Sequence, residues 1–197
     1  MTAGLARVSP SARRQLAAAA IGAAAGAAAA APLLPASHVF GSAVLCAAMA
    51  AIAYDDALRL RVPDRWVYGA LVTGIAWNVV LRLRSEYGLP AAVGIPLLSA
   101  IVCGGAFLAV REAFYRLRGV DGLGFGDVKL AAAGGAWLGW EAFAFAVVVA
   151  AAGALGFVGA AALRGRRWDA SRRLAFGAFL APAIWAVWIA WQIAGNG

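Results

Sequence analysis

The sequence predicts an all-α fold, a polytopic integral membrane bundle of about seven transmembrane helices. Of the 197 residues, 64% are apolar and only 13% are charged, which is too little polar surface to cover a soluble domain of this size. The apolar residues gather in runs suited to crossing a bilayer, which takes roughly 20 residues as a helix. The basic residues concentrate in alternate connections, as they do in proteins threaded through a membrane.

The apolar runs define the expected helices in chain order. The candidate segments are residues 16–34, 38–54, 66–81, 89–110, 128–140, 142–163 and 174–194. In the first, Gly22 and Gly26 are spaced to let another helix approach closely, and Gly153, Gly156 and Gly159 suggest the same for the sixth. The fifth is the shortest and is rich in Gly and Ala, so we expect it to be tilted, partly interfacial or extended by the preceding loop.

Tryptophans mark the expected membrane interfaces. Trp66 lies at the start of the third segment, and five of the other seven lie near the outer ends of the fifth and seventh: Trp137, Trp140, Trp185, Trp188 and Trp191. We interpret them as interfacial anchors rather than as a cage for a ligand.

Charge placement predicts the orientation. Fifteen of the seventeen Lys and Arg residues fall on one side of the predicted topology, and only Arg82 and Arg84 fall on the other. Cytoplasmic loops retain Lys and Arg, so we expect the N-terminus inside, with residues 1–15 as a cytoplasmic tail, and the C-terminus outside. The net charge of +8 is therefore attributed to topology and anionic lipid, and no nucleic-acid partner is expected.

The first segment has a second interpretation. Arg13 and Arg14, the Ala-rich residues 16–31 and the small residues after them also resemble a secretory signal peptide. Cleavage there would leave the acidic loops on the cytoplasmic side, so the functional argument is the same under both interpretations. We expect residues 1–197 to form one integral membrane domain, because no polar connection is long enough for a separate core.

Cysteine and histidine usage excludes several chemistries. Cys46 and Cys103 are isolated in apolar segments with no CxxC pair, so no metal or cofactor is expected. His38 is the only histidine and lies at the opposite side from the acidic loops, so no histidine-activated nucleophile can form there.

Two carboxylate groups carry the functional prediction. Asp55 and Asp56 end the second segment, and Asp127 begins the fifth, so the topology brings both groups to the cytoplasmic face. Gly124 and Gly126 precede Asp127, and glycines would let an extended peptide approach a catalytic acid. Two nearby carboxylates share one proton, so the charged one can activate water while the other binds the peptide carbonyl.

Structural explanations for the acids remain open. Asp127 could be the N-cap of a helix starting at Val128, and Asp64, after Pro63, could cap the third segment. Asp56 could instead pair with Arg59 or Arg61.

Three stretches resemble the type IV prepilin leader peptidases, with the resemblance spanning residues 53–181. Residues 56–64 match the first aspartate motif, with Pro63 and Asp64 at its end, and residues 122–130 match the second, GxGDxK. Residues 176–181 are similar to a further family segment, although Ala178 stands where proline is often found.

The resemblance implies a cytoplasm-facing aspartyl endopeptidase of the inner membrane that removes the short basic leader from prepilin-like proteins. By position, Asp56 and Asp127 are its catalytic pair, Asp55 is the fallback, and Gly124, Gly126, Pro63 and Asp64 support the motifs. Lys129 matches the motif lysine and is expected either to favour the charged state of the pair or to hold the motif loop. Longer family members carry a region with paired CxxC motifs associated with methyl transfer. None exists here, so the short, peptidase-only type is expected.

Other functions remain as alternatives. Presenilin-like and signal-peptide-peptidase enzymes also use YD and GxGD, but their Pro-Ala-Leu-Pro motif is missing here. A small proton- or cation-coupled transporter would hold acids near the midplane, whereas these lie at the interface. An inactive scaffolding homologue is a third alternative.

Overall fold

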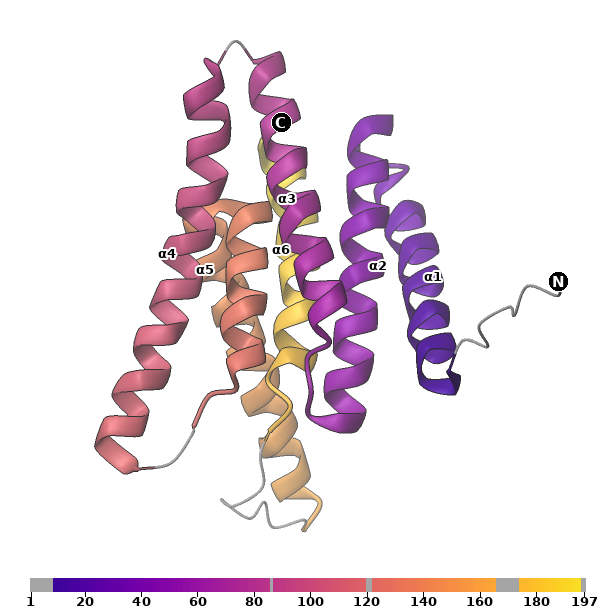
Figure 1. Ribbon diagram of the computed structural model, residues 1–197. Coiled ribbons are helices and arrows are strands. Elements are labelled where there is room, and N and C mark those ends of the chain that lie inside the picture. Colours follow the sequence, from indigo (N-terminus) through magenta and orange to yellow (C-terminus); the bar gives the residue numbers. More distant parts are fainter. Residues whose placement is uncertain (1–8, 86, 120–121, 166–173, 196–197) are drawn as a thin grey trace, which may run out of the picture.

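The computed structural model is an all-α bundle (Figure 1) and describes residues 9–85, 87–119, 122–165 and 174–195. Its helices are α1 (Pro10–Ala30), α2 (Ala36–Arg59), α3 (Asp64–Arg84), α4 (Leu89–Arg118), α5 (Phe125–Leu163) and α6 (Gly177–Gly195). Five of them, α2 to α6, are long and apolar enough to cross a membrane. The all-helical membrane fold is thus confirmed, while the count of seven spans and the orientation of the termini stay predictions.

The fifth and sixth predicted segments are the two arms of α5. Gly139, at φ 77° and ψ 171°, interrupts the helical backbone between residues 125–138 and 140–163. The arms lie side by side (Figure 1), and a Cβ on Gly134 in the first would come within 2.6 Å of the Phe143 ring in the second. Glycine is favoured at the break because a positive φ is costly for other residues.

The other boundaries differ from the prediction by a few residues. Helix α1 begins at Pro10, so residues 10–15, expected to be part of a cytoplasmic tail, form its first turns. Helix α2 continues through both aspartates to Arg59, and α4 continues to Arg118. Of the basic residues assigned to the cytoplasmic side, five lie outside the described residues: Arg7, Arg166, Arg167, Arg172 and Arg173.

Small residues bring α1 and α2 together as predicted. A Cβ on Gly22 would lie 2.6 Å from the Ala50 Cβ, and one on Gly26 would lie 2.6 Å from the Cys46 Cβ. Ser42 on α2 donates a hydrogen bond to the Gly26 carbonyl at 2.8 Å. The same prediction is wrong for α5, because Cβ atoms on Gly156 and Gly159 would meet no described atom within 4 Å.

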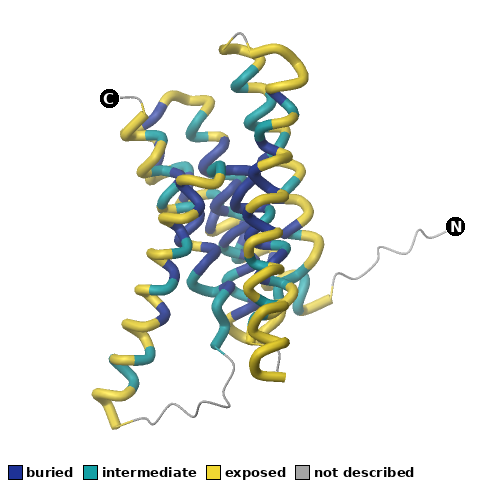
Figure 2. Tube along the Cα trace, turned by 90° about the vertical axis from the view of Figure 1, so that its left-hand side faces the viewer, coloured by how far each residue is buried: buried dark blue, intermediate teal, exposed yellow. Residues whose placement is uncertain are grey.

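The core corrects the prediction for two of the tryptophans. Trp137 and Trp188 are only 3% and 1% exposed and pack edge to face, with ring centroids 6.0 Å apart. The Trp137 indole N–H donates to the Ala70 carbonyl at 2.7 Å, which fastens the first arm of α5 to α3. These two indoles therefore lie in the interior of the bundle. Figure 2 shows the buried residues concentrated where the helices pack against one another.

Four helix ends meet at one end of the bundle and position the site. The C-terminus of α2 and the N-termini of α3, α5 and α6 all lie there (Figure 1). Each end is marked in the sequence: Leu60 caps α2 in the left-handed conformation, Pro63 precedes α3 and Gly124 precedes α5. Short connections after these ends keep the side chains of different helices close together.

Candidate active site

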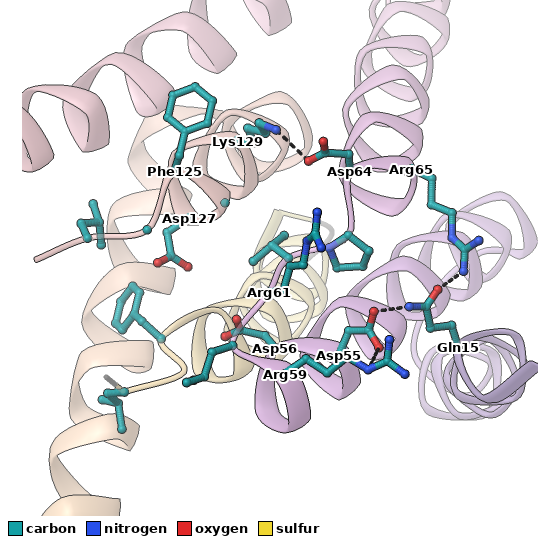
Figure 3. Close-up of a pocket in the computed structure, with 18 of the residues that line it drawn as sticks. Gln15, Asp55, Asp56, Arg59, Arg61, Asp64, Arg65, Phe125, Asp127 and Lys129 are labelled. Atoms are coloured by element: carbon teal, nitrogen blue, oxygen red, sulfur yellow. Dashed lines mark hydrogen bonds and ion pairs between the residues drawn. The ribbon is translucent and has the colours of Figure 1, made fainter. Parts of the chain in front are cut away.

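The carboxylates of Asp56 and Asp127 converge at this end of the bundle. Asp56 lies in the last turn of α2 and Asp127 in the first turn of α5, and they are 5% and 8% exposed. A Cβ placed on Gly177 of α6 would lie 2.9 Å from Asp56 Oδ2 and 3.2 Å from Asp127 Oδ1. Both acids line one cavity of about 820 Å³ (Figure 3), so residues 71 positions apart share a single site.

Asp56 is held by the backbone of α6. The Ala178 N–H donates to Asp56 Oδ2 at 2.9 Å. A carboxylate in the last turn of a helix is disfavoured by that helix's own dipole, and the N-terminus of a second helix offsets this. The predicted alternative of an ion pair with Arg59 or Arg61 is not seen among the described residues, where Arg59 faces Asp55 instead.

Asp127 is not an N-cap. Helix α5 begins at Phe125 with Gly124 as its N-cap residue, which makes Asp127 the third helical residue. Its Oδ2 faces back toward Gly124, lying 3.3 Å from the place of a Cβ there. Its Oδ1 is buried and makes no hydrogen bond with any residue that the structure describes. That oxygen points to the side where Asp56 lies.

The glycines of the second motif serve internal packing. A Cβ on Gly126 would lie 2.7 Å from the Cβ of Val62, in the connection between α2 and α3. This corrects the expectation that Gly126 leaves room for a substrate backbone, because Val62 occupies that room. The close approach brings the first motif against the start of α5 and so helps to bring Asp56 to Asp127.

Lys129 and Asp64 join the two motifs. The Lys129 ammonium lies 2.7 Å from Asp64 Oδ1 and also stands over the rings of Tyr68 and Phe125. Asp64 is the first residue of α3 and makes no capping hydrogen bond, so the prediction that it caps this helix is wrong. Of the two roles expected for Lys129, the contacts favour holding the motif loop.

Asp55 faces away from the pair, into a separate cluster (Figure 3). Gln15 of α1 donates to Asp55 Oδ2 through its side-chain amide and accepts a hydrogen bond from Arg65 of α3. Arg59 Nε lies 3.8 Å from Asp55 Oδ1. We call Gln15, Asp55, Arg59 and Arg65 the Asp55 cluster.

Sequence reasoning missed two contributors to this region. Gln15 was overlooked, although it is the one polar side chain next to the Ala-rich first segment and is 5% exposed. Gly177 was noted as part of a family segment without a role, and only the folded chain brings it to the acids. Among the described residues, no group of three or more His, Cys, Asp or Glu side chains could hold a metal ion.

Comparisons with known proteins identify the family to which the sequence is similar. The sequence profile of the Type IV leader peptidase family matches residues 43–161, which include both acids and both motifs. A protein named prepilin leader peptidase/N-methyltransferase from Burkholderia pseudomallei strain 1026b is 37% identical over 149 residues, covering 75% of this chain and 45% of that protein. One of the same name from Aeromonas hydrophila is 29% identical over 154 residues, covering 78% and 50%.

A shorter relative matches over more of its length. Leader peptidase HopD from Escherichia coli is 33% identical over 132 residues, covering 67% of this chain and 81% of that protein. The chain spans about half the length of the two longer relatives. No solved structure gave a significant match.

Proposed function

The chain belongs to the type IV leader peptidase family, and on that premise we propose that it is a membrane aspartyl endopeptidase that cleaves the leader from prepilin-like proteins. Asp56 and Asp127 are its catalytic pair. The observation that carries the proposal is that these two buried carboxylates, from different helices, converge in one cavity.

The proposed chemistry is hydrolysis through a water molecule and without a covalent intermediate. Two carboxylates facing one another share a proton, so one is charged and one is protonated. The charged carboxylate takes a proton from water as the water oxygen bonds to the scissile carbonyl carbon. The protonated acid gives its proton to the carbonyl oxygen.

Collapse of the resulting diol breaks the C–N bond. The second acid recovers its proton from a diol hydroxyl, and the first passes the proton from water to the departing amine. Both carboxyl groups return to their starting states. The titration belongs to the pair rather than to either residue.

The proposed orientation places this chemistry at the cytoplasmic face of the inner membrane, with seven passes and the N-terminus inside. Support comes from five basic residues that line the same cavity as the acids: Arg59, Arg61, Arg65, Arg111 and Lys129. Positive residues are retained on the cytoplasmic side. A prepilin-like substrate would present its polar leader at this face and its apolar helix to the bilayer.

Methyl transfer is not part of the proposal. The N-methyltransferase in the names of the longer relatives belongs to those proteins. The family resemblance links paired CxxC motifs to methyl transfer. The 197 residues here contain two cysteines and no CxxC pair.

Coexpression with candidate prepilins tests the proposal. We expect the wild type to shorten a prepilin at the boundary between leader and apolar helix, as read by mass spectrometry of the product. Asp127→Asn should abolish the product. Cleavage in the middle of the apolar helix would indicate presenilin-like activity instead, and unchanged cleavage by Asp127→Asn would overturn the assignment of the pair.

A further inference from the structure

Gly177 is the point at which the two acids and a third helix meet. It is the first residue of α6 and is buried. The nearest atoms to a Cβ on Gly177 would be Asp56 Oδ2 at 2.9 Å, Asp127 Oδ1 at 3.2 Å and Asp56 Cγ at 3.2 Å. The space that a side chain would fill is therefore taken by the two carboxylates themselves.

Backbone conformation does not explain a glycine here. The positive-φ glycines in the described chain are Gly119, Gly139 and Gly165, and Gly177 is not among them. Because its φ is not positive, the Gly177 backbone does not by itself exclude an alanine. What excludes the alanine is contact: carbon atoms seldom come within about 3 Å of a carboxylate oxygen, so one acid would have to move.

We propose that Gly177 is a positioning residue of the dyad, whose lack of a side chain lets the Asp56 and Asp127 carboxylates close on each other. The expected effect on cleavage rests on the proposed function, whereas the contact of Gly177 with the two acids does not. A methyl group at this position enters between the two acids and separates them. The charged and protonated carboxyl groups then no longer act on the same water and peptide.

The neighbouring hydrogen bond is a separate contribution. The Ala178 N–H that binds Asp56 also lies 3.2 Å from the Ala175 carbonyl, so it is shared between two acceptors. Gly177→Ala leaves this N–H in place and therefore tests the space beside the acids.

Kinetics with a purified prepilin substrate test the catalytic part. We expect Gly177→Ala to lower kcat about 100-fold, the usual consequence of misplacing reacting groups by about 1 Å, with KM changed less than about threefold. Gly153→Ala is the matched control, because its added Cβ would meet only the Phe179 ring of α6, at an ordinary 3.5 Å. Retention of wild-type kcat by Gly177→Ala overturns the proposal, as does an equal loss in Gly153→Ala.

A distance measurement in intact membranes keeps the test independent of activity and folding yield. In a background with Cys46→Ala and Cys103→Ala, the double variant Asp56→Cys/Asp127→Cys should cross-link efficiently with a short bifunctional thiol reagent. Adding Gly177→Ala should lower the yield at least about threefold, whereas Gly153→Ala should not. Unchanged cross-linking overturns the proposal, even if Gly177→Ala lowers the melting temperature. Failure of the wild type to cleave any prepilin would instead count against the proposed function and leave this measurement valid.

Discussion

Asp55 and Asp56 are sequence neighbours with the same 5% exposure, yet they have opposite surroundings. Asp55 accepts a hydrogen bond from Gln15 and lies near Arg59, and Arg65 completes the cluster by donating to Gln15. Asp56 has one backbone N–H and faces a second acid across a cavity. Successive residues on a helix point about 100° apart, and that rotation is enough to separate the two environments.

The difference teaches which acid can do chemistry. The Asp55 carboxylate is already engaged, because it accepts a hydrogen bond from Gln15 and lies near the Arg59 guanidinium. A carboxylate beside another carboxylate can hold or release a proton at little cost, because the pair shares it. The Asp55 cluster joins α1, α2 and α3, whereas Asp56 and Asp127 are the residues that we propose for proton transfer.

The largest expected effect separates the two acids of the pair from Asp55. Asp127→Asn and Asp56→Asn keep the shape of each side chain but remove its ability to carry charge, so each should lower the cleavage rate by on the order of 10²–10⁴-fold. Initial rates on a purified prepilin provide the measurement. Unchanged melting temperatures in detergent would show that the loss is chemical. A rate within tenfold of the wild type for either variant would remove that residue from the pair.

A smaller effect is expected where the two motifs touch. Gly126→Ala places a methyl group 2.7 Å from the Val62 Cβ, so the connection between α2 and α3 must move away from α5. We expect the cleavage rate to fall about tenfold, because Asp56 moves with that connection. The double variant Gly126→Ala/Val62→Gly removes the clash and should recover most of the rate. Without that recovery, packing against Val62 is not the reason for the glycine.

Much of the fold could be predicted from composition and spacing. Seven apolar runs marked the helical segments, and the boundary between residues 140 and 142 fell next to the break at Gly139. The interior was predicted less well. Trp137 and Trp188 were assigned to the interface because tryptophan favours it, but their rings pack together inside the bundle, where Trp137 also has a backbone acceptor.

The candidate site was predictable in its acids and less so in its supports. Topology alone placed Asp56 and Asp127 on one side, and motif spacing favoured Asp56 over Asp55. Gly177 could not be placed, because its contact with the acids depends on how α6 packs, and sequence carries no signal for that. Gln15 was missed for the same reason: its partners, Asp55 and Arg65, lie 40 and 50 residues away.

Disrupting the Asp55 cluster should affect stability more than rate. Asp55→Ala leaves the buried Gln15 amide N–H without its acceptor, which typically costs about 1–3 kcal/mol. We expect a lower melting temperature and a cleavage rate within about fivefold of the wild type. Gln15→Leu should give a similar loss of stability, and the double variant should lose less than the sum because the two residues share one interaction. Loss of cleavage in Asp55→Ala with normal melting would reverse the roles of the two neighbours.

The smallest effect is expected at the Lys129–Asp64 ion pair. The Asp64 side chain is 61% exposed, so solvent screens the pair and keeps its contribution to stability small. Lys129→Met and Asp64→Asn should therefore each lower the cleavage rate only about twofold, by loosening the connection between the motifs. Exchanging the charges, Lys129→Asp with Asp64→Lys, should restore the rate if holding the loop is the role of the lysine. If the charge exchange does not restore the cleavage rate and Asp64→Asn leaves that rate unchanged, Lys129 instead acts on the charge of the Asp56–Asp127 pair. The pair Glu112–Arg116, which joins two residues of α4 and touches neither motif, provides the control for nonspecific charge effects.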